Sequence, residues 1–115
     1  MSIPKNPRGN LLPMSIDSIH DIICQELFVT KEEIMNVPRY RGKEVVDARK
    51  IAIYIGYTNK HNSYSELLRT YHLSSNQSIQ YAIETTKNLI ENDIRFKKKY
   101  DKVTESIMYK LMQDN

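Results

Sequence analysis

The stretch SYSELLRTYHLSSNQSIQYA, residues 63–82, decides the fold of this chain. It begins with Ser63 followed three residues later by Glu66, the spacing of a capping box that starts a helix. That helix is short, and after a turn Ser75 can act as the N-cap of a longer one. A short capped helix, a turn of three to four residues and a second capped helix form the layout of a helix-turn-helix.

Small polar side chains occupy the turn and the start of the second helix, namely Ser74, Ser75, Asn76, Gln77 and Ser78. In a helix-turn-helix this part of the second helix enters the major groove, where base edges present donors and acceptors. Asparagine and glutamine can pair with adenine through two hydrogen bonds, and the free amides of a helix start attract phosphate. The pattern predicts a DNA-reading surface, although a plain polar turn between two helices has the same composition.

Helical periodicity runs through most of the remaining chain, from Ile16 onward. Thr30 and Glu33 form another capping box, and residues 51–55 are apolar on all sides, as in a helix buried between others. The fold class predicted is all-α, a compact bundle of about six helices. These are expected at residues 16–27, 31–36, 43–57, 64–71, 76–91 and 94–112.

The first residues differ in composition, because three prolines and a glycine fall within residues 1–13. Such a stretch favours an extended backbone, so we expect a flexible arm over residues 1–14 and one helical domain over residues 15–115. A hydrophobic content of 40% and a charged content of 27% suit a globular protein. No apolar run is long enough for a bilayer, and the single Cys24 fits a reducing compartment, so a cytoplasmic location is expected.

Basic residues cluster just before and within the predicted central helix, although the formal net charge is only +3. Arg39, Arg41 and Lys43 stand in or beside a loop, where such side chains can enter or flank a minor groove. Arg49 and Lys50 follow on the helix and are expected to hold phosphates, together with Ser63. A second basic cluster, residues 94–102, is expected to be mainly solvated surface.

Catalytic and metal-binding patterns are missing from the sequence. His20, His61 and His72 are far apart and have no cysteine or carboxylate at ligand spacing. No basic residue stands beside Cys24 to activate it, and the glycines do not form a phosphate-binding loop. We therefore expect a protein that is not an enzyme and that uses no metal, nucleotide or other cofactor.

Two runs stand out within residues 16–111, DARKIAIYI at residues 47–55 and NSYSEL at residues 62–67. They are similar to ARQIAMYL and SLPEIG of one family, so residues 16–111 resemble the C-terminal DNA-binding domain of the bacterial chromosomal replication initiator DnaA. Ala82 falls at the alanine that closes the family's GGRDHSTVLHA signature, without a gap. In place of GGRDHSTV this chain has HLSSNQSI, residues 72–79.

The resemblance implies a helix-turn-helix fold of the Trp-repressor and DnaA type and the family's way of docking on duplex DNA. In the family the signature's aspartate, histidine and adjoining hydroxyl residue touch bases and phosphates, and here Ser75, Asn76 and Gln77 stand at those positions. Because these residues differ, the family's target sequence does not carry over. The family's ATPase domain has no counterpart in these residues, so a stand-alone relative is expected.

Two functions are compatible with these patterns. The first is sequence-specific binding of double-stranded DNA, in replication initiation or its control. The alternative is a protein-interaction module of the same fold that has lost specific DNA binding and docks on a replication or transcription protein. The alternative is supported by the predicted second helix of the pair, where Glu84 and Glu91 outweigh Lys87.

Overall fold

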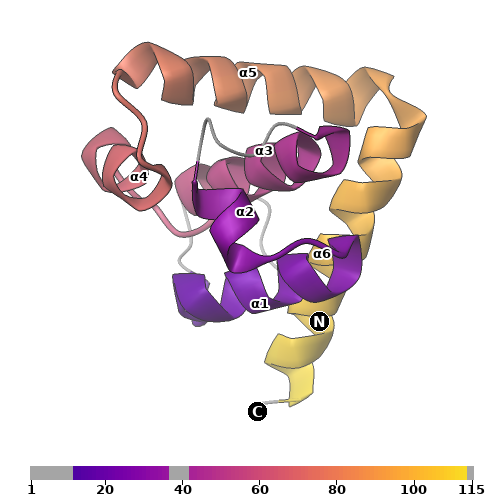
Figure 1. Cartoon of the computed structure of the whole chain (residues 1–115). Coiled ribbons are helices and arrows are strands. Elements are labelled where there is room, and N and C mark those ends of the chain that lie inside the picture. The colour runs from indigo at the N-terminus through magenta and orange to yellow at the C-terminus, as the bar shows by residue number, and fades with distance from the viewer. Residues whose placement is uncertain (1–11, 37–41, 114–115) are drawn as a thin grey trace.

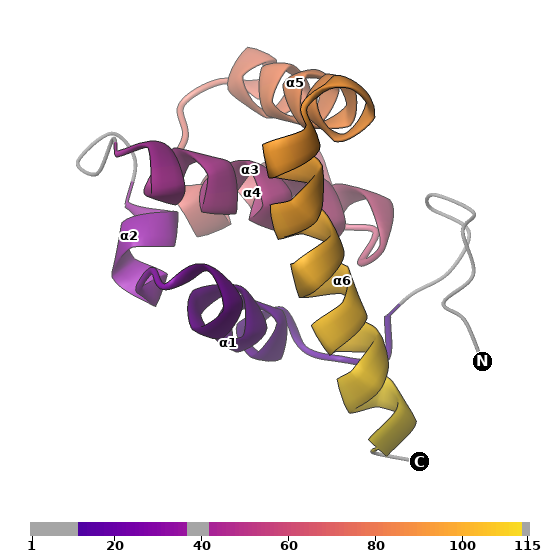
Figure 2. The same ribbon diagram turned by 90° about the vertical axis from the view of Figure 1, so that its right-hand side faces the viewer.

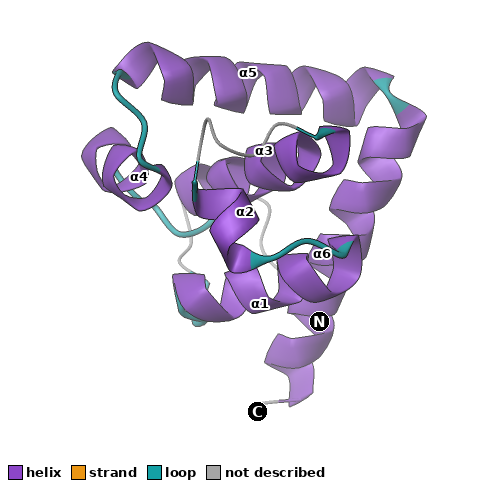
Figure 3. Ribbon diagram, in the orientation of Figure 1, coloured by secondary structure: helices purple, strands orange, loops and turns teal. Residues whose placement is uncertain are grey.

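A computed structural model of the chain describes residues 12–36 and 42–113, and these residues form six α-helices and no strand (Figure 1 and Figure 3). The predicted all-α class is confirmed, and each predicted helix begins at the expected residue and ends within one residue of the expected end. The helices are α1 (Ile16–Leu27), α2 (Lys31–Met35), α3 (Lys43–Thr58), α4 (Tyr64–Tyr71), α5 (Asn76–Asn92) and α6 (Ile94–Gln113).

Side-chain caps start most of these helices, as the sequence predicts. Thr30 Oγ1 accepts the backbone N–H of Glu33 at 3.1 Å, and the Glu33 carboxylate accepts the N–H of Thr30 at 2.9 Å. Ser63 and Glu66 form the same kind of reciprocal pair at the start of α4. Each cap satisfies N–H groups that have no partner inside the helix, so local sequence alone defines where the helix begins.

Helix α3 is the centre of the molecule. Its apolar residues Ile51, Ile53 and Ile55 are almost fully buried, because α1, α2, α4 and α5 all pack against it. Gly56 lies inside this helix, which continues to Thr58. Gly56 permits close packing, since a Cβ there would lie 3.2 Å from both Asn62 Oδ1 and Leu67 Cδ2.

Helices α5 and α6 frame one side of the core. α5 lies along α3, and at Asp93 the chain turns sharply into α6, which runs past α1 (Figure 1 and Figure 2). The Asp93 carboxylate accepts the backbone N–H groups of Arg95 at 3.0 Å and Phe96 at 3.1 Å and so starts α6. As a result, α6 joins the C-terminal end of α5, far from the α4–α5 turn.

The segment before α1 is part of the core, which corrects the predicted extent of the N-terminal arm. Leu12 and Met14 are buried, and the Leu12 N–H donates to Asn59 O at 3.0 Å. Lys60 Nζ donates to the carbonyls of Leu12 at 3.0 Å and Met14 at 2.5 Å. The arm predicted for residues 1–14 therefore overlaps the packed domain at its last residues, while residues 1–11 lie outside the described part.

Within the described ranges, no helix is long and apolar enough to cross a membrane. The same residues contain no group of three potential metal ligands. His20 is instead a core residue: its Nε2 hydrogen-bonds the hydroxyl of Tyr71 at 2.8 Å, and burial lowers the pKa of the imidazole. This bond joins α1 to the last residue of α4.

Candidate nucleic-acid interface

A four-residue turn, residues 72–75, joins α4 to α5. His72 ends α4 in the left-handed conformation with φ 54°, and its N–H donates to Leu68 O. The N–H of Leu73 also donates to Leu68 O, at 2.9 Å, while its side chain packs against the core. These contacts fix the direction in which α5 leaves α4.

The start of α5 presents a set of polar side chains to solvent. Ser75 Oγ accepts the N–H of Ser78 at 3.4 Å and lies 3.3 Å from Ser78 Oγ, so both hydroxyls serve the cap. Ser74, Asn76 and Gln77 are exposed, and their side chains make no hydrogen bond within the described part of the chain. Of the five polar residues predicted to contact DNA here, three are therefore free to bind a ligand.

The exposed face of α5 continues beyond these residues. Tyr81 lies one turn after Gln77 and is 68% exposed, and Gln80 Nε2 donates to the Glu84 carboxylate at 3.1 Å. Tyr81 is not among the residues predicted to contact DNA, because tyrosine suits a core as well as a surface. Its position outside the buried stripe of Ile79, Ala82 and Thr86 was the available signal.

Two of the predicted basic contacts lie on described, accessible parts of α3. Lys43 is its first residue, with a side chain that is 72% exposed, and Lys50 is half-buried. Arg39 and Arg41 lie outside the described residues, so their predicted groove contacts stay predictions.

Arg49 is bound by the protein itself. Only 8% of this residue is exposed, its Nε donates to Ile34 O at 3.0 Å, and its Nη2 donates to Glu33 O at 2.9 Å. Burial lowers the pKa of the guanidinium. The guanidinium binds carbonyls in the last turn of α2 and holds α2 against α3, so the structure does not favour the predicted phosphate contact of Arg49, which stays a prediction.

Ser63 is also occupied by the protein itself. Its Oγ accepts the N–H of Glu66 at 3.2 Å, and its own N–H donates to the Glu66 carboxylate at 2.6 Å. The backbone hydrogen bond from Ser63 lowers the pKa of Glu66, so a carboxylate anion stands at this helix start. Because that charge repels phosphate, the structure does not favour the predicted phosphate contact of Ser63.

The free polar residues and Lys43 lie towards opposite ends of α5. Lys43 is close enough to Asp93, at the C-terminal end of α5, for its charge to act on that carboxyl. Asn76 begins the same helix, which has 17 residues and so is about 25 Å long at about 1.5 Å per residue. Lys43 and Asn76 therefore lie near opposite ends of this helix.

Comparison with known proteins finds relatives that match most of this chain. No protein-family model matches the chain. The chain is 30% identical over 93 residues to the chromosomal replication initiator protein DnaA of Wolinella succinogenes. The matched residues make up 81% of this chain and 20% of that protein. It is 26% identical to the DnaA proteins of Campylobacter fetus subsp. fetus and Sulfurimonas denitrificans, over 84% and 85% of this chain and 22% of each of them.

The chain thus spans about a fifth of the length of the curated relatives it matches. The matched part covers more than four-fifths of this chain, far more than a single shared motif would. These similarities identify the chain as a divergent relative of the chromosomal replication initiator DnaA, over a segment about a fifth as long as that protein.

Proposed function

We propose that this chain binds double-stranded DNA in a sequence-specific manner, with α4, the turn and α5 acting as a helix-turn-helix. The observation that carries the proposal is the start of α5, where Asn76 and Gln77 are exposed and unpaired within the described residues. Because its relatives are named as chromosomal replication initiators, we propose a role in replication initiation or its control, in the cytoplasm. The role is one of binding, without a catalytic step.

Base reading would come from one face of α5. Asn76 and Gln77 can each form two hydrogen bonds with an adenine, and the ring of Tyr81 can contact a thymine methyl group. Glu84, one turn further along, can accept a hydrogen bond from the amino group of a cytosine. Ser75 and Ser78 keep the helix start intact, so their contribution is to orient the readers rather than to read.

Backbone contacts would position this face on the duplex. The free N–H groups at the start of α5 favour an anion, and Lys43 and Lys50 are the accessible cations of α3. Arg39 and Arg41 stay predicted minor-groove contacts. Each lysine that neutralises one phosphate should add about 0.9 to the salt dependence of binding.

A second function, docking on a replication or transcription protein, is favoured by a different observation. Phe28, Ile94, Tyr109 and Met112 are large apolar side chains on the surface. Exposed apolar groups favour protein contacts, and the acidic Glu84 and Glu91 on α5 weaken its attraction for DNA.

A randomised duplex pool titrated at about 50 and about 200 mM salt separates the two functions, because phosphate contacts make affinity fall steeply with salt. Selection of the bound sequences should then give a defined site. Asn76→Ala and Gln77→Ala should each cost about 1–3 kcal/mol and relax specificity at one or two base pairs. The matched control is Gln25→Ala, on the exposed face of α1. Absence of binding at the lower salt would favour the protein-docking function.

A further inference from the structure

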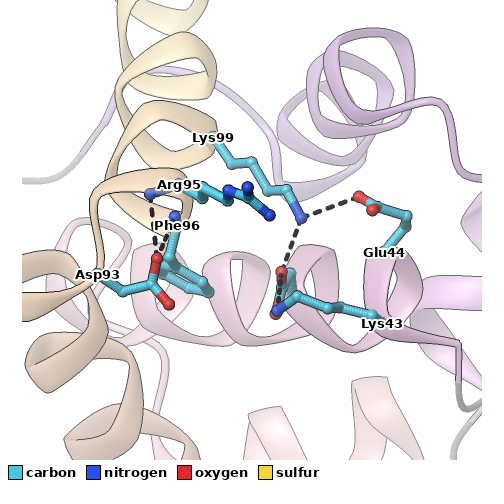
Figure 4. A network of polar contacts seen from close by, with 7 residues as sticks. Lys43, Glu44, Asp93, Arg95, Phe96 and Lys99 are labelled. Carbon is cyan, nitrogen blue, oxygen red and sulfur yellow. Dashed lines mark hydrogen bonds and ion pairs between the residues drawn. The ribbon is translucent and has the colours of Figure 1, made fainter.

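Two lysines share one buried carboxylate where α3 meets α6 (Figure 4). Asp47 lies one turn after the start of α3, and its side chain is only 5% exposed. Its Oδ2 is 2.7 Å from Lys99 Nζ of α6 and 3.2 Å from Lys43 Nζ. Lys99 Nζ is also 2.9 Å from the Glu44 carboxylate.

The two lysines are held very differently. The Lys99 side chain is 22% exposed and lies between two carboxylates. Burial alone would lower the pKa of Lys99, but the hydrogen bonds to Asp47 and Glu44 outweigh it and raise the pKa. Lys43 is largely exposed and bonds Asp47 at the longer distance, so Lys99 is the resident counter-ion and Lys43 the exchangeable one.

A buried carboxylate is stable only with a cation or hydrogen-bond donors beside it. While Lys99 is present, Asp47 keeps a close counter-ion when Lys43 turns towards a ligand. Without Lys99, Lys43 is the remaining ion-pair partner that the described residues offer to Asp47. Release of Lys43 would then leave a buried charge unpaired.

The carboxylate of Asp93 also lies near Lys43, but it competes less than Asp47 for the Lys43 ammonium group. Its Oδ1 already accepts the N–H groups of Phe96 and Arg95, and the bond from Phe96 is the main reason its pKa is lowered. Asp47 is therefore the carboxylate that decides whether Lys43 is available. In Figure 4 the Asp93 carboxylate is joined to Arg95 and Phe96, whereas Lys99 reaches across to Glu44.

We infer that Lys99 is a positioning residue for DNA binding: by neutralising Asp47 it frees Lys43 to contact a phosphate. The inference rests on the proposed function. It gives a role in DNA binding to a lysine that points into the protein, 52 positions along the chain from the carboxylate it neutralises.

The first test compares the salt dependence of duplex binding in three variants. Lys43→Met should lower the slope by about 0.9, the value for one phosphate contact. Lys99→Met should lower it equally, and the double variant should show no further loss. Lys110→Met, on the exposed last turn of α6, controls for the loss of one positive charge. An additive double variant, or a Lys99→Met slope like that of the control, overturns the inference.

A rescue variant separates positioning from simple support of the fold. In Asp47→Asn/Lys99→Met the buried carboxylate that holds Lys43 is gone, so the slope should return to that of the starting protein. If Lys99 merely supported the fold, the second substitution would not restore the slope. Lys99→Arg, which keeps the charge, should bind as the starting protein does.

A measurement without DNA decides the ion-pair exchange independently. The acylation rate of each lysine by an amine-reactive ester can be followed by mass spectrometry. Lys99→Met should slow the labelling of Lys43 several-fold and leave Lys110 unchanged. An unchanged rate at Lys43 overturns the inference, whereas failure of the starting protein to bind any duplex would refute the proposed function by itself.

Discussion

Replacement of Arg49 by methionine distinguishes its structural role from the phosphate contact that the sequence predicts. Methionine fills similar space but removes the hydrogen bonds to Ile34 O at 3.0 Å and Glu33 O at 2.9 Å. Hydrogen bonds from a charged donor contribute about 1.5–3 kcal/mol each. Part of this is recovered because water reaches the partly buried Glu33 carbonyl, so we expect a loss of about 3 kcal/mol in the free energy of unfolding.

Urea unfolding followed by circular dichroism measures this loss. With a slope of about 1–3 kcal/mol per molar urea, the midpoint should fall by roughly 1–3 M. Lys50→Met is the matched control, because it removes the same charge from the next residue. It should change stability by about 0.5 kcal/mol or less and instead lower the salt slope of DNA binding by about 0.9.

The opposite pattern would refute this assignment. If Arg49→Met were as stable as the starting protein and lost one unit of salt slope, the guanidinium would be a phosphate contact. The hydrogen bonds to α2 would then contribute nothing measurable. Binding is to be compared well below the urea midpoint and at a temperature where both proteins are folded.

Three further predictions test other parts of the structure. Burial lowers the pKa of His20 below its usual 6.5, so as the pH falls His20 takes up a proton in the unfolded chain before it does in the folded protein. The free energy of unfolding should therefore be unaffected by His20 above pH 6.5. Below pH 6.5 it should fall by up to about 1.4 kcal/mol per pH unit. Urea midpoints between pH 7.5 and 5.5 should show this slope, and His20→Gln should flatten it. Gly56→Val should destabilise the protein by about 1–3 kcal/mol in thermal unfolding, because a Cβ at this position already lies 3.2 Å from atoms of Leu67 and Asn62. A variant of unchanged stability would mean that α3 and α4 separate easily. Ser63→Ala should cost about 0.5–2 kcal/mol through its lost cap but leave the salt slope of DNA binding unchanged, and a reduced slope would restore Ser63 as a phosphate contact.

Helix boundaries could be predicted from the sequence because they depend on neighbours within one turn. The boxes Thr30–Glu33 and Ser63–Glu66 satisfy their own helix starts, and Ser75 does the same for α5. The exposure of Asn76 and Gln77 could also be predicted from the sequence, since residues at the start of a capped helix that lie outside its apolar stripe face solvent.

Contacts between distant segments could not be predicted in this way. Arg49 and Lys50 have the same charge and adjacent positions, but a rotation of about 100° per residue turns one into the α2–α3 junction and leaves the other accessible. From the sequence, Leu12 and Met14 are assigned to a proline-rich arm. In the structure Lys60, more than 40 residues away in the chain, donates hydrogen bonds to their carbonyls.

By itself, then, the sequence determined the helices, their caps and the polar start of α5, because these depend on local hydrogen bonds and periodicity. Only the tertiary structure decided which basic residues are available for a ligand. That choice depends on which carbonyl or carboxylate another helix brings within hydrogen-bonding distance: α2 brings carbonyls to Arg49, and α3 brings the Asp47 carboxylate to Lys99.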